Sequence, residues 1–277
     1  MFYTYLYGYR MNTLQKIAVA FFTLCTVLWA VLYVQDIREG FYNYLYSFLF
    51  GLIPLFGGAV AMYKARIWGG FSSAVGKAVF FVGLGVFCWG VGECIWSYYN
   101  LVLNVPAPYP SLADLGFAPS IFFYSLGAFY LSKATGAKFG FRNPLAKVFV
   151  AVTPLVVLAF SWWLLINVAR GGVLVPEGEP ILKAILDIAY PLGDFVGLVI
   201  AIIVSGLSFR YLGGRYVVDV IAILLGLLAM YIGDTIFSYT TTAGTFYNGQ
   251  LGDLFLSSGT FLLTYGALGF STHTTDE

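Results

Sequence analysis

The sequence is dominated by stretches of about 20 mostly apolar residues, each long enough to cross the hydrocarbon core of a bilayer as an α-helix. Eight such stretches occur, at approximately 14–35, 41–63, 76–101, 111–132, 146–169, 181–206, 216–240 and 250–271. Only 10% of the 277 residues are charged and 60% are hydrophobic, whereas soluble domains average about 25% charged residues. The sequence therefore predicts an all-α integral membrane protein: eight transmembrane helices forming a single transmembrane domain, 1–277.

The positions of the basic residues predict how the chain is oriented. Eleven of the fourteen Lys and Arg precede the first stretch or lie between stretches 2 and 3, 4 and 5, or 6 and 7: Arg10, Lys16, Lys64, Arg66, Lys77, Lys133, Lys138, Arg142, Lys147, Arg210 and Arg215. Only Arg38, Arg170 and Lys183 fall on the other side. Because cytoplasmic loops are enriched in Lys and Arg, we expect a multi-pass protein of the cell membrane with both termini in the cytoplasm. The net charge of +1 gives no basic surplus for nucleic acid, so the lipid bilayer is the expected partner.

Two segments of the chain resemble each other. Gly92–Tyr98 (GECIWSY) matches Gly233–Tyr239 (GDTIFSY) at an offset of 141 residues. Weaker matches in the same order join Asp114-Leu115 to Asp253-Leu254, Gly127-Ala128 to Gly266-Ala267, and Pro54-Leu55 to Pro191-Leu192. We interpret these matches as a 4+4 parallel duplication with internal repeats at about 14–132 and 145–271, related by an axis along the membrane normal. The alternative is chance similarity between apolar segments rich in Gly and Leu.

Six carboxylates lie within or at the ends of the apolar stretches: Glu93, Asp114, Asp187, Asp194, Asp234 and Asp253. Glu93 is 16 residues beyond Lys77, or about 24 Å along a helix, which places it in the outer half of a core about 30 Å thick. The same reasoning places all six in the non-cytoplasmic half, where we expect Lys183 to be the only nearby cation. Acids inside a membrane are costly unless they are paired, protonated or exposed to a wet cavity, so they indicate a functional site.

These acids and the aromatic residues near them predict an outward-facing ligand-binding pocket formed by Glu93, Trp96, Tyr98, Asp114, Asp187, Tyr190, Asp194, Asp234, Tyr239 and Asp253. An all-oxygen site suits Ca²⁺ or Mg²⁺, and Glu93, Asp194 and Asp234 are the ligands expected if a metal binds. An organic cation is equally admissible, because the aromatic rings offer cation–π faces. The single histidine, His273, and three cysteines without a CxxC motif argue against haem, zinc or disulfide chemistry.

Three of the acids also have structural explanations. Asp114 follows Ser111 in an S-x-x-D capping-box pattern, and Asp253 occupies the expected first turn of the last stretch. Asp219, which follows Arg215 by four residues, suits a structural ion pair at the cytoplasmic rim.

The run G-E-x-x-W-x-Y-Y, P-x-P-Y-P-S-L-A-D from Gly92 to Asp114, together with D-I-A-Y-P-L-G-D at Asp187–Asp194, resembles the multi-span membrane sensory regions of some prokaryotic signalling proteins. Such regions often precede diguanylate cyclase or histidine kinase domains. The resemblance implies an eight-helix ligand-sensing module. Because no output domain follows Phe270, it further implies a separate cytoplasmic signalling partner, an excised sensor, or a likeness of architecture alone.

A second resemblance concerns Leu192-Gly193-Asp194 and Leu251-Gly252-Asp253, which are similar to the G-x-G-D element of intramembrane aspartyl proteases, although Pro191 and Gln250 replace that family's first Gly. Three functions follow from these patterns. A non-enzymatic sensor, which the sequence favours, predicts an outward cavity closed below the midplane. A secondary transporter, with duplicated halves and proline-broken second and sixth stretches, predicts polar access from both sides. An aspartyl hydrolase predicts two carboxylates within about 5 Å that share a proton.

Overall fold

A computed structural model describes residues 9–134, 144–175, 177–208 and 216–270. Over these residues the protein is all-α, and the eight predicted helices are confirmed. They are α2 (Thr13–Val34), α3 (Phe41–Lys64), α4 (Ala74–Leu101), α5 (Asp114–Ala134), α6 (Pro144–Trp162), α7 (Ile181–Ser208), α8 (Val217–Thr242) and α9 (Leu251–Gly269). Two short 3₁₀ helices, η1 (Ala65–Trp68) and η2 (Gly70–Ser72), join α3 to α4, and a π-helical turn, η3 (Trp163–Val168), extends α6.

Seven of the described helices, α2 to α8, are long and apolar enough to cross a membrane, which supports a multi-pass membrane protein. The remaining described helix, α9, has 19 residues and is not apolar enough along its length to be counted with them. Its polar residues Ser257, Thr260 and Thr264 are buried within the bundle. Since these side chains are covered by neighbouring helices, α9 needs less overall hydropathy than a helix that faces lipid.

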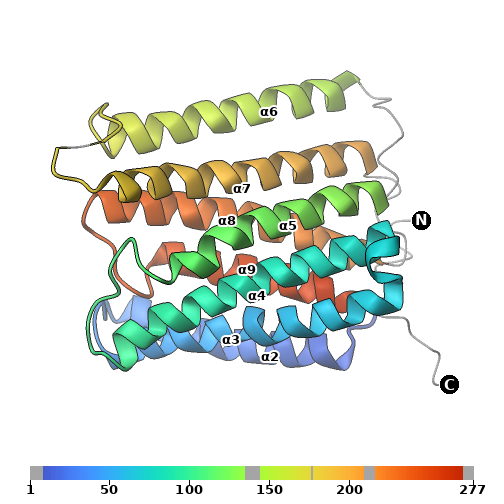
Figure 1. Ribbon diagram of the computed structural model, residues 1–277, viewed down its shortest axis with the longest axis horizontal. Helices are drawn as coiled ribbons and strands as arrows, with labels where there is room; N and C mark the ends of the chain where they lie inside the picture. The colour runs from blue at the N-terminus through green and yellow to red at the C-terminus, as the bar shows by residue number, and fades with distance from the viewer. Residues whose placement is uncertain (1–8, 135–143, 176, 209–215, 271–277) are drawn as a thin grey trace.

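The helices pack as two groups that meet in the middle of the molecule (Figure 1). Helix α4 packs mainly against α3 and α5, and α8 packs mainly against α7 and α9. The groups are joined where α9 lies on α3 and where α7 lies on α5. Helices α2 and α6 are peripheral, and most of their side chains face outward.

Small residues let the central helices approach closely. A Cβ atom added at Gly116 of α5 would lie 2.5 Å from the carbonyl oxygen of Cys88 and 2.4 Å from the amide nitrogen of Gly92, both in α4. Only glycine fits such backbone contact, which is the usual way in which membrane helices pack tightly.

Helix starts follow local sequence signals, whereas the expected breaks at proline do not form. Asn12 and Gln15 make a reciprocal capping box at α2, and the Ser73 hydroxyl accepts the amide of Gly76 at α4. Helices α3 and α7 continue through Pro54 and Pro191. The expectation of proline-broken spans is therefore wrong, because in each case the surrounding helix holds the chain on both sides of the proline.

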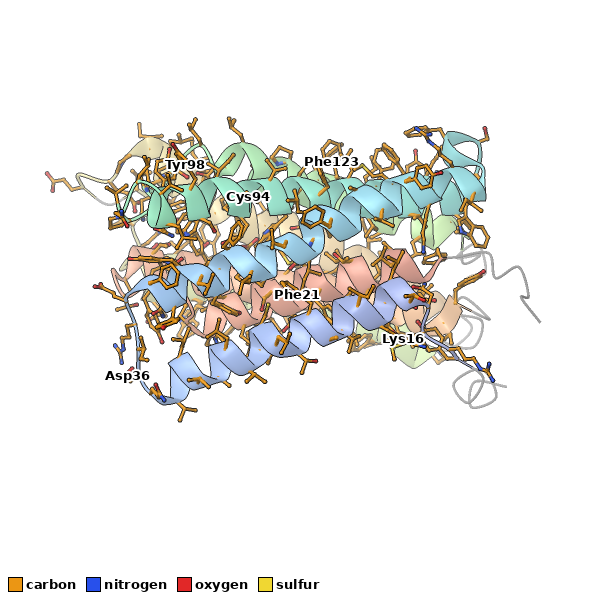
Figure 2. All side chains as sticks on the ribbon, turned by 90° about the horizontal axis from the view of Figure 1, so that it is seen from below. Lys16, Phe21, Asp36, Cys94, Tyr98 and Phe123 are labelled. Carbon is orange, nitrogen blue, oxygen red and sulfur yellow. The ribbon has the colours of Figure 1, made fainter. Side chains whose placement is uncertain are left out.

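The two ends of the bundle differ in charge. One end, which we call the basic end, carries the described residues Arg10, Lys16, Lys64, Arg66, Lys77, Lys133 and Lys147. The opposite, acidic end carries Arg38, Arg170 and Lys183 together with the six acids identified above. Figure 2 shows Lys16 and Asp36 at these opposite ends. The other four basic residues, Lys138, Arg142, Arg210 and Arg215, and also His273, lie outside the described residues.

Candidate ligand-binding site

A cavity opens at the acidic end, between α3, α4, α5, α7, α8 and α9. The cavity has a volume of about 50 Å³, which is room for several water molecules or one narrow ligand. Residue order along the helices divides its wall into three layers. The floor is Phe50, Trp89, Phe117 and Leu256; a ring of four acids is Glu93, Asp114, Asp234 and Asp253; and the roof is Trp96, Tyr109, Phe237 and Phe246.

Two of the four acids cap helices as well as lining the cavity. The Asp114 Oδ2 atom accepts the amide of Ser111 at 2.6 Å, and the Ser111 hydroxyl accepts the amide of Ala113 at 3.1 Å. The expected contact of Asp114 with the helix start is thus confirmed, although the box is not reciprocal, because Ser111 accepts the amide of Ala113 rather than that of Asp114. The Asp114 Oδ1 atom accepts a hydrogen bond from the Tyr190 hydroxyl. The Asp253 Oδ2 atom accepts the amide of Gly249 at 2.5 Å, at the start of α9.

The other two acids lie deeper and lack such donors. Glu93 is 5% exposed and Asp234 is 9% exposed. Among the described residues, no N–H group donates to either carboxylate, and no Lys or Arg lines the cavity. These two side chains are therefore buried acids that line the cavity without a basic residue or an N–H donor.

The roof is an aromatic cluster held in place by Asn248. The ring centroids of Phe237 lie 5.1 Å from those of both Tyr109 and Phe246, and Trp96 lies 5.9 Å from Phe246. The Trp96 Nε1 atom donates to the Asn248 side-chain oxygen at 2.9 Å. Tyr109, in the connection between α4 and α5, is buried, and burial raises the pKa of its phenol above the usual value.

Asp194 lies behind the cavity rather than in its wall. The Tyr124 hydroxyl donates to Asp194 Oδ1 at 2.5 Å, and the Asp194 carboxyl lies against that of Asp234. Two buried carboxyl groups in contact repel each other when both are ionised, so this contact favours a shared proton. The resemblance to aspartyl proteases implied Asp194 and Asp253 instead, but the acidic neighbour of Asp253 is Glu93.

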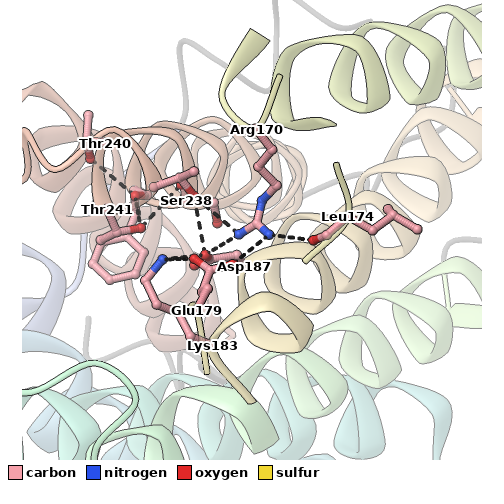
Figure 3. A network of polar contacts seen from close by, with 10 residues as sticks. Arg170, Leu174, Glu179, Lys183, Asp187, Ser238, Thr240 and Thr241 are labelled. Atoms are coloured by element: carbon pink, nitrogen blue, oxygen red, sulfur yellow. Dashed lines mark hydrogen bonds and ion pairs between the residues drawn. The ribbon is translucent and has the colours of Figure 1, made fainter. Parts of the chain in front are cut away.

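Asp187 belongs to a separate ion-pair cluster (Figure 3), and its assignment to the pocket is wrong. Its Oδ2 atom lies 2.5 Å from Arg170 Nη2 and 3.0 Å from Lys183 Nζ. Glu179 completes the cluster, 2.6 Å from Lys183 and 3.2 Å from Arg170. Sequence reasoning named only Lys183 as a cation here. A signal for Arg170 did exist, because an arginine at the acidic end is rare and needs a partner.

Tyr98 and Tyr239 were also expected in the pocket and do not line it. Tyr98 is 52% exposed, and Tyr239 is half-buried. Each follows a roof residue, Trp96 or Phe237, by two positions, which turns a side chain about 200° around a helix. Both tyrosines therefore point away from the cavity.

Sequence reasoning missed much of the aromatic lining. Phe117 in the floor and Phe237 in the roof each lie three residues from an acid of the ring, so helical spacing could have identified them. Phe246 and Asn248 belong to a connection whose position the helical pattern does not determine.

Asp219 lies at the basic end, far from this cavity. Its Oδ1 atom accepts the Tyr9 hydroxyl at 2.7 Å and the Gln15 side-chain amide at 2.8 Å. Arg215, the partner expected from the sequence, lies outside the described residues.

The ring of acids does not have the arrangement of a metal centre. In the described part of the chain, no group of three His, Cys, Asp or Glu side chains is placed to hold a metal ion. Of the three acids that we considered as metal ligands, Glu93 and Asp234 line the cavity, whereas Asp194 is behind Asp234. Comparison with known proteins adds no assignment, because no family model, curated protein or solved structure matches this chain.

Proposed function

We propose that this protein is a membrane sensor that binds a small organic cation in the cavity at its acidic end. The observation that carries the proposal is the charge imbalance of the cavity wall. Four carboxylates line it, while the described cations at the same end pair elsewhere: Arg170 and Lys183 with Asp187 and Glu179, and Arg38 with Asp36. A cationic ligand would supply the missing charge.

The aromatic floor and roof favour an organic cation over a metal ion. Rings above and below the acids offer cation–π faces to an ammonium group. Mg²⁺ requires a nearly ideal octahedron of oxygens, and the described acids form no such group.

The packing below the cavity favours a sensor over the transporter alternative. Val82, Tyr124, Leu227, Met230 and Leu263 are almost completely buried in the bundle between the acid ring and the basic end. The polar side chains packed beside them, Ser125, Thr260 and Thr264, are neutral hydroxyls. A path for protons or cations would need ionisable groups or water through this region. The likeness of Gly92–Asp114 to prokaryotic sensory regions supports the same choice, and we propose that a separate cytoplasmic protein receives the signal.

Corresponding helix contacts support the 4+4 duplication. A Cβ atom at Gly85 of α4 would meet Tyr124 of α5, and one at Gly226 of α8 would meet Leu263 of α9. These contacts are related by offsets of 141 and 139 residues, the same offsets as the sequence matches. In α3 and α7, Gly57 faces Thr264 as Gly197 faces Ser125. Gly57 and Gly197 are 140 residues apart, whereas Pro54 and Pro191 are 137 residues apart. The two prolines therefore do not occupy equivalent positions in the two halves.

We further propose that α9 is the eighth span and that the basic end, with both termini, is cytoplasmic. Cysteines introduced at exposed positions of the two ends test this orientation. A membrane-impermeant maleimide added to intact cells should label Asp36→Cys and not Arg66→Cys. The opposite labelling pattern would reverse the orientation and place the cavity inside.

The binding proposal is tested by the thermal stability of the purified full-length protein with tetramethylammonium, butylammonium, Na⁺, Mg²⁺ or Ca²⁺ as chloride salts. An organic cation at 100 times its Kd should stabilise the fold by about 2.7 kcal/mol. Glu93→Gln should lose this effect, and Asp36→Asn, an exposed acid at the same end, should keep it. The proposal fails if neither organic cation stabilises the wild type. If proteoliposomes that contain the protein take up a cation that it binds, the transporter alternative would be correct and the sensor proposal wrong.

A further inference from the structure

The four acids of the cavity form two pairs, and this inference rests on the function proposed above. In the first pair, Glu93 of α4 has Asp253 of α9 as its charged neighbour. In the second pair, Asp234 of α8 and Asp114 of α5 both lie beside the Tyr190 phenol, which donates to Asp114. Each pair therefore combines one residue from the first four helices with one from the last four.

The two pairs are equivalent under the relation between the halves. Glu93 corresponds to Asp234 at an offset of 141, and Asp114 corresponds to Asp253 at an offset of 139. The glycine contacts of the same helices show these two offsets. The relation between the two halves of the chain thus maps the first pair of acids onto the second pair. The cavity lies at the junction between the two halves.

Within each pair, the chain itself offsets one of the two charges. Asp114 and Asp253 lie in the first turns of α5 and α9 and accept backbone amides of Ser111 and Gly249. The positive end of a helix dipole stabilises an acid at this position. Glu93 and Asp234 lie inside helices and receive no such amide from the described residues, and the carboxyl group beside Asp234 belongs to another acid, Asp194. On each side of the cavity, one acid, Glu93 or Asp234, is therefore left without a described cation or amide to balance its carboxylate.

We infer that the ligand is a linear diamine, a dication with one ammonium group at each acid pair. A monocation would leave the Glu93 side or the Asp234 side uncompensated, and a buried charge without a partner is costly. The walls between the pairs are apolar and aromatic: Trp89, Phe117 and Leu256 on the floor, Trp96 and Phe237 on the roof. These surfaces suit a methylene chain, and the ammonium hydrogens would satisfy the unpaired Glu93 carboxylate.

Calorimetric titration of the full-length protein in nanodiscs tests this inference. The probes are 1,3-diaminopropane, 1,4-diaminobutane and 1,5-diaminopentane, each compared with the monoamine of the same carbon number. At pH 7 these amino groups are protonated, so the comparison isolates the second charge. We expect the best diamine to bind at least about tenfold more tightly than its monoamine, a difference of about 1.4 kcal/mol.

Two variants test whether both sides contribute. Glu93→Gln and Asp234→Asn remove equivalent charges, and each should lower diamine affinity about tenfold or more, to that of the monoamine. The Asp36→Asn variant, altered at an exposed acid of the same end, should bind as the wild type does. If a variant does not fold, the comparison of diamine with monoamine in the wild type still decides whether the second charge of the ligand contributes to binding.

The outcomes separate this inference from the proposed function. If monoamines bind as tightly as the diamines, the inference that the ligand is a dication is wrong, but the proposal that the cavity binds an organic cation is retained. A diamine affinity that depends on only one of Glu93 and Asp234 would overturn the two-sided arrangement. If no amine binds, the proposed function itself fails.

Discussion

Two groups of buried acids at the same end of this protein differ in where their counter-charges come from. In the ion-pair cluster, Arg170 and Lys183 balance Asp187 and Glu179. In the cavity, four carboxylates face one another with aromatic side chains between them and no described Lys or Arg. Burial is similar in both, so burial alone does not identify a binding site. What distinguishes the cavity is that no described basic residue pairs with its acids.

The difference has a topological cause. The ion-pair cluster forms around a single connection, because the chain leaves η3 at Arg170 and returns in α7 at Asp187. The cavity draws its acids from α4, α5, α8 and α9. Tight packing of these central helices depends on glycine and small side chains, and the side chains that they direct into the cavity are acids and aromatic residues.

Removal of the central cation of the ion-pair cluster should have the largest effect on stability. Arg170→Gln leaves Asp187 and Glu179 with Lys183 alone, and breaking a buried pair costs about 3–5 kcal/mol. The measurement is thermal or denaturant unfolding in detergent. Arg38→Gln is the matched control, because its pair with Asp36 is 64% and 70% exposed and should contribute less than about 1 kcal/mol. Equal losses in the two variants would contradict the central role of Arg170.

The same acid-to-amide change should have opposite effects in the two regions. Asp187→Asn leaves Arg170 partly unbalanced and should destabilise the protein by about 2–3 kcal/mol. Glu93→Gln removes an unbalanced charge that makes no hydrogen bond within the described residues. Without ligand it should leave stability unchanged or raise it by about 1 kcal/mol, as often occurs at binding sites. Unfolding of both variants in amine-free buffer measures this contrast. A large loss for Glu93→Gln would show that Glu93 is structural.

A smaller loss than at Arg170 or Asp187 is expected where a neutral tyrosine donates to an acid of the cavity. Tyr190→Phe removes the O–H group that donates to Asp114, which should cost about 1–2 kcal/mol. Tyr98→Phe, at an exposed position of α4, is the control and should change stability by less than about 0.5 kcal/mol. A Tyr190→Phe protein as stable as this control would mean that Asp114 is satisfied by Ser111 alone.

Part of the candidate site followed from the sequence, and helical geometry explains the part that did not. Glu93, Asp114, Asp234 and Asp253 were expected to converge and do line one cavity, with Trp96 and Tyr190. Asp194 was expected beside them, but its position on α7 directs it toward Tyr124 and the back of Asp234. A rotation of 100° per residue decides such outcomes, and hydropathy does not specify which face of an apolar helix meets which neighbour.

The sequence by itself determined the eight helices, their approximate ends and the gathering of acids at one end, because these depend on local composition and on distance along the chain. It also determined the cap at Asp114, which depends on a contact three residues away. Only the tertiary structure decided that Asp187 pairs with Arg170 while Glu93 and Asp234 keep an open cavity between them. That division depends on which helices are neighbours and on whether a cation can reach each carboxylate, and both depend on how the whole bundle packs.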